Sequence, residues 1–240
     1  MKYQGGKYRI ARKLVAAMHA LVPTPRAIVE PFAGGLNMTS AMGECWPNTL
    51  IYASDIRPEV ATLWNALIRG WDPPSRITRE EWARIKATPT EDPRLVAWNA
   101  LAASFNGTGK GYGGETAGWA TGAPGVQYNY VREARNASLR QVKRLANLDI
   151  RGAAYTDAAI LPGDLVYCDP PYAGVTGYKT PFDNRAFWDW ARSWPDADVF
   201  VSEYTGPCEP VLSLRTQVSI RSAGSRHATE NLYYFPRRAS

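Results

Sequence analysis

The tetrapeptide Asp169-Pro170-Pro171-Tyr172 brings together groups that can hold an amino group and aim it at a reactant. It directly follows segment 164–168 (DLVYC), which is predicted to be a buried strand. The two prolines fix the backbone and remove two N–H donors, so the Asp169 carboxylate and the Pro170 carbonyl can both point outward as acceptors. An amino group held by two acceptors directs its lone pair away from them, toward an electrophile. Tyr172 adds a flat face for stacking, and a plain turn with an aromatic plug is the alternative interpretation.

A second segment, Glu30-Pro31-Phe32-Ala33-Gly34-Gly35, lies between a predicted strand, 27–30, and a helix predicted from Leu36. Its glycines let the backbone approach a ligand, but it is not a GxGxxG motif and no phosphate-loop lysine follows. Asp55 ends the next predicted strand, 50–54, where nucleotide-binding α/β folds supply a carboxylate to ribose hydroxyls. A ribose clamp without a phosphate cradle fits S-adenosylmethionine better than a nucleoside triphosphate.

A third segment, Tyr3-Gln4-Gly5-Gly6-Lys7, precedes a helix predicted from the helical spacing of apolar residues between Ile10 and Leu21. Glycines this close to a helix start allow a tight loop against a ligand. Lys7 is of the right type to meet the carboxylate of a methionine moiety.

Strands and helices alternate around these segments. Further helices are predicted at 57–69 and 131–147, and further strands at 199–202 and 232–235. This order predicts an α/β protein with a parallel, doubly wound sheet, in which ligands bind beyond the carboxyl ends of the strands.

The middle of the chain has a different character. From Trp71 to about Asn129 the composition shifts to Pro, Gly, Thr and Trp, with one helical piece predicted at 94–104. The glycines between 107 and 114 predict a flexible loop. We therefore expect an inserted subdomain or a long functional loop here.

The predicted helix 131–147 has two unlike faces. Its apolar face carries Val131, Ala134, Ser138, Val142 and Leu145. Its basic face carries Arg132, Arg140, Lys143 and Arg144. This basic face is either an ordinary solvated surface or a surface that contacts nucleic-acid phosphates.

Composition bounds the class of protein. The 240 residues suffice for one α/β domain with a modest insertion. A formal charge of +6 suits a polyanionic partner but also an ordinary basic enzyme. The three cysteines form no CxxC pair, so we expect a reducing compartment without disulfides or a zinc site. No apolar run is long enough to span a bilayer and the amino end lacks a signal-type core, so we expect a cytoplasmic protein.

In their order, these segments resemble the Dam-type (D12 class) adenine-N6 DNA methyltransferases of bacteria and their phages, in the family's α arrangement. The Tyr-x-Gly-Gly-Lys loop comes first, followed by Pro-Phe-x-Gly-Gly, the acidic strand end, the recognition region and Asp-Pro-Pro-Tyr. Segment 104–109 (SFNGTG) resembles the Phe-Asn-x-x-Gly segment that opens the family's recognition region, and 229–234 (TENLYY) resembles its terminal strand. The chain departs from the family at 202–204 (SEY), where Ser-Asn is usual, and in its glycine-rich stretch 106–125.

The resemblance implies roles for individual residues. The target adenine would be held at the catalytic turn by Asp169, Pro170, Pro171 and Tyr172. S-adenosylmethionine would be contacted by Tyr3, Lys7, Phe32, Gly34, Gly35, Asp55 and Asp169. DNA would be contacted by Asn106 and by the basic helix face of Arg132, Arg140, Lys143 and Arg144.

The sequence therefore predicts a class I Rossmann-like methyltransferase core, residues 1–70 and 152–240, with a target-recognition and DNA-binding insertion, residues 71–151. The expected reaction is site-specific transfer of methyl from S-adenosylmethionine to N6 of an adenine flipped out of duplex DNA, which leaves S-adenosylhomocysteine and needs no metal. Three alternatives are a cytosine-N4 methyltransferase, an RNA methyltransferase and a catalytically silent DNA-binding relative; Asp55 and Asp169 argue against the last.

The resemblance also suggests a biological setting. It implies a bacterial cell or a phage-infected host, double-stranded DNA as the partner and no membrane. A cognate restriction enzyme is a candidate partner, and GATC is the candidate recognition site.

Overall fold

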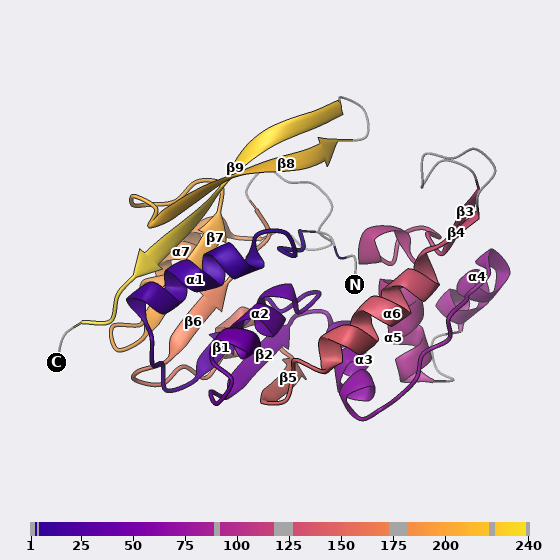
Figure 1. Ribbon diagram of the computed structural model, residues 1–240, viewed down its shortest axis with the longest axis horizontal. Helices are drawn as coiled ribbons and strands as arrows, with labels where there is room; N and C mark the ends of the chain where they lie inside the picture. The colour runs from indigo at the N-terminus through magenta and orange to yellow at the C-terminus, as the bar shows by residue number, and fades with distance from the viewer. Residues whose placement is uncertain are drawn as a thin grey trace.

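A seven-stranded sheet runs through the protein (Figure 1). The computed structural model describes residues 3, 5–88, 92–117, 127–172, 182–220 and 224–238. The strand order in the sheet is β5-β2-β1-β6-β7-β9-β8. The strands are β1 (Ile28–Glu30), β2 (Ile51–Asp55), β5 (Leu148–Gly152), β6 (Leu165–Cys168), β7 (Asp198–Glu203), β8 (Leu212–Ile220) and β9 (Gly224–Phe235).

The sheet is mixed rather than purely parallel, which corrects the sequence-based expectation. β5, β2, β1, β6 and β7 pair in parallel, whereas β9 is antiparallel to both β7 and β8. β8 and β9 form a hairpin, which connects neighbouring antiparallel strands with a short link. In Figure 1 this hairpin extends beyond the rest of the sheet. The α/β fold with this sheet is consistent with the expected Rossmann-like methyltransferase core.

Helices cover both faces of the central strands. Successive residues of a strand point to opposite faces, and in β6 Leu165 and Tyr167 pack with α1 (Ala11–Leu21) and α2 (Asn37–Cys45). Val166 and Cys168 pack on the other face with α7 (Asn184–Ala191). All four side chains are fully buried, as expected for a strand covered on both sides.

A third group of helices packs beyond the β5 edge of the sheet. It comprises α3 (Pro58–Ile68), α4 (Arg79–Ala87), α5 (Pro93–Leu101) and α6 (Tyr130–Val142). Trp64 of α3 and Trp98 of α5 are fully buried in one apolar cluster, to which Val131 of α6 also belongs. The apolar face predicted for segment 131–147 is therefore buried as expected, but the helix is shorter than predicted. α6 ends at Val142, so Lys143, Arg144 and Leu145 lie beyond it. The small hairpin β3 (Glu115–Ala117) and β4 (Gln127–Asn129) and two short helices, η1 (Phe105–Gly107) and η2 (Tyr155–Asp157), complete the described elements.

Local sequence signals explain where these helices begin. Thr78 and Glu81 form a capping box at α4, with reciprocal bonds of 3.2 and 2.7 Å between side chains and backbone N–H groups. Asp92 caps α5 ahead of Pro93. The Asn129 side chain accepts from the Arg132 N–H at 2.8 Å, so α6 begins at Tyr130.

The carboxyl-terminal end of the predicted insertion overlaps a strand of the main sheet. β5 spans Leu148–Gly152, and all of it except Gly152 lies within the range predicted for the insertion, 71–151. It nevertheless pairs in parallel with β2 of the main sheet. β5 was not predicted as a strand. The range predicted for the insertion therefore overlaps the last part of the chain before Gly152, which belongs to the main sheet. Across the described residues no helix is long and apolar enough to cross a bilayer.

Candidate active site

The candidate residues gather where the strand order of the sheet changes direction. β1 is followed in the chain by β2 on one side, while β6 lies on its other side. In open α/β sheets this switch point opens a crevice outside the carboxyl ends of the strands. Asp169 directly follows β6, Pro31 directly follows β1, and Asp55 is the last residue of β2. The structure therefore brings the three sequence-predicted segments to one edge.

Asp55 organises the glycine loop after β1. Its Oδ2 accepts the N–H of Gly34 at 2.9 Å, and its Oδ1 accepts the N–H of Arg57 at 2.9 Å. Burial raises the pKa of Asp55, and these two backbone hydrogen bonds partly oppose the rise. A carboxylate has about four lone-pair sites, so Asp55 retains acceptors for a ribose hydroxyl. The residue fits the expected ribose clamp and also fixes the loop.

Tyr3 packs directly on the two glycines of this loop. Gly34 has a φ of +48°, and a Cβ there would lie 2.8 Å from Cε1 of Tyr3. A Cβ on Gly35 would lie 2.9 Å from Cβ of Tyr3. Both distances are too short for a side chain, so glycine is needed for close approach as well as for conformation. Tyr3, Gly34 and Gly35 are thus brought together as the sequence predicts.

Helix α6 holds the same loop from the other side. The amide Nε2 of Gln141 donates to the carbonyl oxygens of Gly35 and Leu36, at 2.9 and 2.7 Å. Leu36 has a left-handed φ of 53°, which an ordinary residue adopts at a cost. Sequence reasoning did not single out Gln141, because its contacts lie more than a hundred residues away in the chain.

Phe32 belongs to a cluster of aromatic rings on the α7 side. Its ring stacks on Tyr155 with centroids 5.4 Å apart and meets Phe187 edge-on at 5.6 Å. Phe32 therefore contributes to packing in the structure. Its predicted contact with the cofactor stays a prediction.

Lys7 lies among acceptors. Its Nζ donates to Asp169 Oδ1 at 2.8 Å and lies 3.4 Å from Glu230 Oε1. Its side chain is only 7% exposed, so these are not surface ion pairs. Burial acts to lower the pKa of Lys7, but Asp169 and Glu230 outweigh it and the net pKa is raised. Lys7 is therefore held as an ammonium beside the catalytic turn, a contact with Asp169 that the sequence did not predict.

The ring of Tyr172 is fixed from several directions. Its hydroxyl donates to Glu230 Oε1, and the Lys7 Nζ lies 4.6 Å from its ring centroid. The ring of Tyr204 meets it at 81° with centroids 4.6 Å apart. Burial raises the pKa of Tyr172 well above its ordinary value, and the nearby Asp169 and Glu230 carboxylates raise it further. Tyr172 therefore remains a neutral phenol.

The pKa is raised for Asp169 of the turn and for a buried carboxyl group near it, Glu30. Burial raises the pKa of Asp169, and the Lys7 ammonium acts against that rise. Burial raises the pKa of Glu30 to about 8, a hydrogen bond from Thr39 opposes the rise, and the carboxylates of Asp169 and Asp55 add to it. Glu30 ends β1 and is 2% exposed. This concentration of acidic groups favours a cationic or hydrogen-bond-donating ligand.

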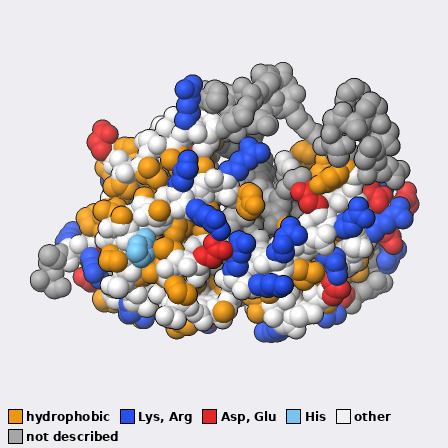
Figure 2. Space-filling model, in the orientation of Figure 1, with side chains coloured by type: hydrophobic (Ala, Val, Ile, Leu, Met, Phe, Trp, Pro, Cys, Tyr) orange, Lys and Arg blue, Asp and Glu red, His pale blue; other side chains and the backbone are white. Residues whose placement is uncertain are grey.

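The predicted DNA-contacting residues are spread along the surface. Arg132, Arg140 and Lys143 are exposed and form no ion pair within the described part of the chain. Arg144 instead pairs with Glu44 at 3.0 Å, and Glu44 also pairs with Arg12 of α1 at 3.3 Å. Figure 2 shows basic side chains gathered over α1 and α6 on this face. The two alternatives for this face, solvation and phosphate contact, both remain compatible with it.

Asn106 lies in a loop that is tied to the site. It has a φ of 52°, and the neighbouring Gly107 carbonyl accepts from Arg57 Nη1 at 2.7 Å. The Phe105 N–H donates to the Gly111 carbonyl at 2.7 Å, and the Gly113 N–H donates to the Ala103 carbonyl at 2.8 Å. The described part of this glycine-rich stretch is therefore a hydrogen-bonded turn. Residues 118–126, which include Trp119, lie outside the described residues.

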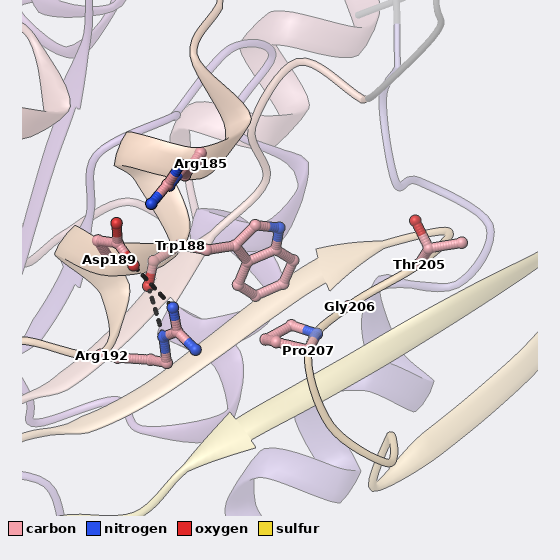
Figure 3. Close-up of a pocket in the computed structure, with 7 residues that line it drawn as sticks. All are labelled: Arg185, Trp188, Asp189, Arg192, Thr205, Gly206 and Pro207. Atoms are coloured by element: carbon pink, nitrogen blue, oxygen red, sulfur yellow. Dashed lines mark hydrogen bonds and ion pairs between the residues drawn. The ribbon is translucent and has the colours of Figure 1, made fainter.

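A separate surface pocket of about 470 Å³ lies between α7 and the segment after β7 (Figure 3). Arg185 and Trp188 of α7 and Arg192, which directly follows α7, line one side, and Thr205 and Pro207 line the other. The Arg192 guanidinium is turned to Asp189 at 2.7 Å. None of the residues predicted for the site lines this pocket.

The comparison with known families agrees with this geometry. Residues 3–91 match the model of the D12 class N6 adenine-specific DNA methyltransferases, a span that contains Tyr3, Lys7, the Gly34-Gly35 loop and Asp55. Comparison with curated proteins gave no match. This match favours the expected adenine specificity over the cytosine and RNA alternatives. Over residues 3–91, which are 89 of its 240 residues, the chain is similar to the D12 class N6 adenine-specific DNA methyltransferase family, whose members use S-adenosylmethionine to methylate adenine N6 in DNA.

Proposed function

We propose that this enzyme methylates N6 of an adenine that has left the DNA duplex, at one recognition sequence, with Asp169, Pro170 and Tyr172 holding the base. One observation carries the proposal: Asp169, Asp55 and the Gly34-Gly35 loop lie together at the carboxyl ends of adjacent strands. A stacked adenine cannot present N6 in line with the methyl donor, so the base must be extruded.

The roles divide between the two sides of the switch point. Asp55 and the Gly34-Gly35 loop, with Tyr3 packed on it, would hold the cofactor. S-adenosylmethionine supplies a methyl group made electrophilic by its sulfonium. The Asp169 carboxylate and the Pro170 carbonyl would each accept a hydrogen bond from the amino group, and Pro171 would keep the turn rigid. Tyr172 would stack on the base, a contact worth roughly 1–3 kcal/mol.

The chain contributes alignment and electrostatics to the transfer. The N6 lone pair forms the new bond to carbon while the electrons of the broken carbon–sulfur bond stay on sulfur. The amino nitrogen becomes positive and then gives up one proton, for which the Asp169 carboxylate is the nearest acceptor in the proposed arrangement. Positioning and charge stabilisation of this kind can supply most of the rate enhancement, and we propose that no metal takes part.

We propose that the region between Trp71 and β5 selects the DNA sequence. Asn106 and the turn around it would reach bases, whereas Arg132, Arg140, Lys143 and Arg144 would contact phosphates and fix the register. The proposed setting is the cytoplasm of a bacterium or of a phage-infected host. A cognate restriction enzyme is the proposed partner, and GATC is the first sequence to test.

Sequencing of DNA from cells that express the protein, with a modified-base readout, tests this function. We expect N6-methyladenine at one short motif, and none in cells that express the Asp169→Asn variant. Methylated adenines scattered without a common motif would contradict site specificity. An absence of N6-methyladenine with the folded wild-type enzyme would contradict the proposed reaction.

A further inference from the structure

Glu230 has no role in the site described so far, yet it is buried and connected to two of its members. It is 5% exposed and lies in β9. Its Oε1 accepts from the Tyr172 hydroxyl and lies 3.4 Å from Lys7 Nζ. A buried carboxylate that contacts both the stacking ring and the ammonium beside Asp169 is a strong candidate for a functional group.

The register of the sheet explains how a residue of the last strand arrives there. β9 is antiparallel to β7, and Asn231 pairs with Glu203, the last residue of β7. Glu230 is the next position along β9, so it lies just beyond the carboxyl end of β7. The neighbouring strand, β6, ends at Cys168, which pairs with Val201 of β7. Asp169 therefore lies just beyond the carboxyl end of β6. The hairpin thus delivers a carboxylate to the same edge.

We propose that Glu230 is a positioning residue for methyl transfer, which fixes the Tyr172 ring through its hydroxyl and shares the Lys7 ammonium with Asp169. This inference rests on the proposed roles of Asp169 and Tyr172. With Glu230 present and both carboxyl groups ionised, the buried group of two carboxylates and one ammonium has a net charge of −1. That charge favours the positive charge that develops on the amino nitrogen during transfer.

Without the Glu230 charge, the interactions of Lys7 and Asp169 should change. Lys7 and Asp169 would form a closed, neutral pair, and Lys7 would compete fully with the target amino group for Asp169. Burial also raises the pKa of Glu230, while the Lys7 ammonium beside it acts against that rise, so Lys7 supports the charged form. The interaction is therefore reciprocal: each of these groups keeps the other in its working state.

The test is Glu230→Gln, which keeps the size and the acceptor for Tyr172 but removes the charge. Exposed Glu209→Gln is the matched control. We expect the single-turnover rate with saturating DNA to fall at least about 10-fold in Glu230→Gln, by analogy with the loss of other charge-stabilising groups. The KM for DNA, the Kd for S-adenosylmethionine and the circular-dichroism melting curve should match those of the control. A lower rate with unchanged binding and unchanged melting is a result that a purely structural role would not produce.

A second variant, Tyr172→Phe, tests the same link without touching the buried charge. It should lower the rate, and the double variant should lose less than the product of the two single losses, because the two residues act through one hydrogen bond. An unchanged rate in Glu230→Gln, or parallel losses of rate, cofactor binding and melting temperature, would overturn the inference. If Asp169→Asn is inactive while Glu230→Gln is fully active, only this inference fails; if Asp169→Asn is active, the proposed function itself fails.

Discussion

The ammonium of Lys7 lies 2.8 Å from the carboxylate of Asp169, although the two residues are 162 positions apart in the chain. The loop before α1 and the turn after β6 therefore form one site. Because both side chains are largely buried, loss of one partner would leave an unpaired charge away from water, which costs more than the loss of a surface ion pair. The Lys7–Asp169 ion pair thus links the segment that precedes α1 with the proposed base-holding turn.

Asp55→Asn should weaken the binding of S-adenosylmethionine. The new amide can present an oxygen to only one of the two N–H groups, of Gly34 and Arg57, that the carboxylate now serves. The ribose hydroxyl would also lose a charged acceptor, a hydrogen bond worth about 1.5–3 kcal/mol, so the Kd should rise roughly 10- to 150-fold. Isothermal titration calorimetry measures this directly.

Asp149→Asn is the matched control for this experiment, because Asp149 lies on the edge strand β5 and pairs with Arg151. Its Kd for S-adenosylmethionine should equal that of the wild type. An Asp55→Asn protein that binds the cofactor as tightly as this control would show that Asp55 serves only the loop.

Arg132→Ala and Arg140→Ala should weaken binding to all DNA sequences alike. Each lost phosphate contact should make the slope of log K against log salt less steep by about 0.9. Fluorescence anisotropy over a series of salt concentrations, with two unrelated duplexes, measures both quantities. Exposed Arg69, which follows α3, provides the control substitution Arg69→Ala. A slope that stays at the wild-type value would mean that the α6 face is only solvated.

Glu30 predicts a pH dependence of stability. Its pKa in the folded protein is about 8, above the ordinary value of 4.5, so folding favours the protonated form. The stability contributed by this group is present in full below about pH 4.5 and is lost as the pH rises toward 8, by up to about 1.4 kcal/mol per pH unit. Glu30→Gln mimics the protonated form and should remove this loss.

Urea unfolding of both proteins at several pH values between about 5 and 9 measures the difference. The free energy of unfolding of the wild type should fall relative to Glu30→Gln as the pH rises, and the gap should stop growing above about pH 8. The exposed Glu209→Gln control should keep the wild-type dependence. Parallel pH curves for wild type and Glu30→Gln would refute the assignment of this carboxyl as protonated at neutral pH.

The strands that carry chemistry were predictable because each is a short apolar run that stops at a polar or proline-rich turn. β1, β2, β6 and β7 were all predicted in this way, within about one residue of their observed ends. β5 and β8 were not predicted, because LDIRG and LSLRTQVSI mix polar and apolar residues as edge strands do. Both lie at the edges of the sheet.

The site itself was predictable only in part. Asp169, Asp55 and the Gly34-Gly35 loop belong to local motifs, so their sequence context identified them. Glu230 and Gln141 reach the site through strand register and helix packing, with partners that are 58 and about a hundred positions away. The hydrogen bonds between backbone groups in the turn that follows Ser104 were not predicted either. Such long-range pairing leaves no local pattern.

The most direct test of the central claim is nucleoside mass spectrometry of duplex DNA after incubation with the purified enzyme and S-adenosylmethionine. The account predicts N6-methyladenine with the wild type. It also predicts at least a roughly 100-fold slower reaction with Asp169→Asn, which should still fold, when S-adenosylmethionine is saturating. N4-methylcytosine as the product, or N6-methyladenine formed by Asp169→Asn at nearly the wild-type rate, would contradict it.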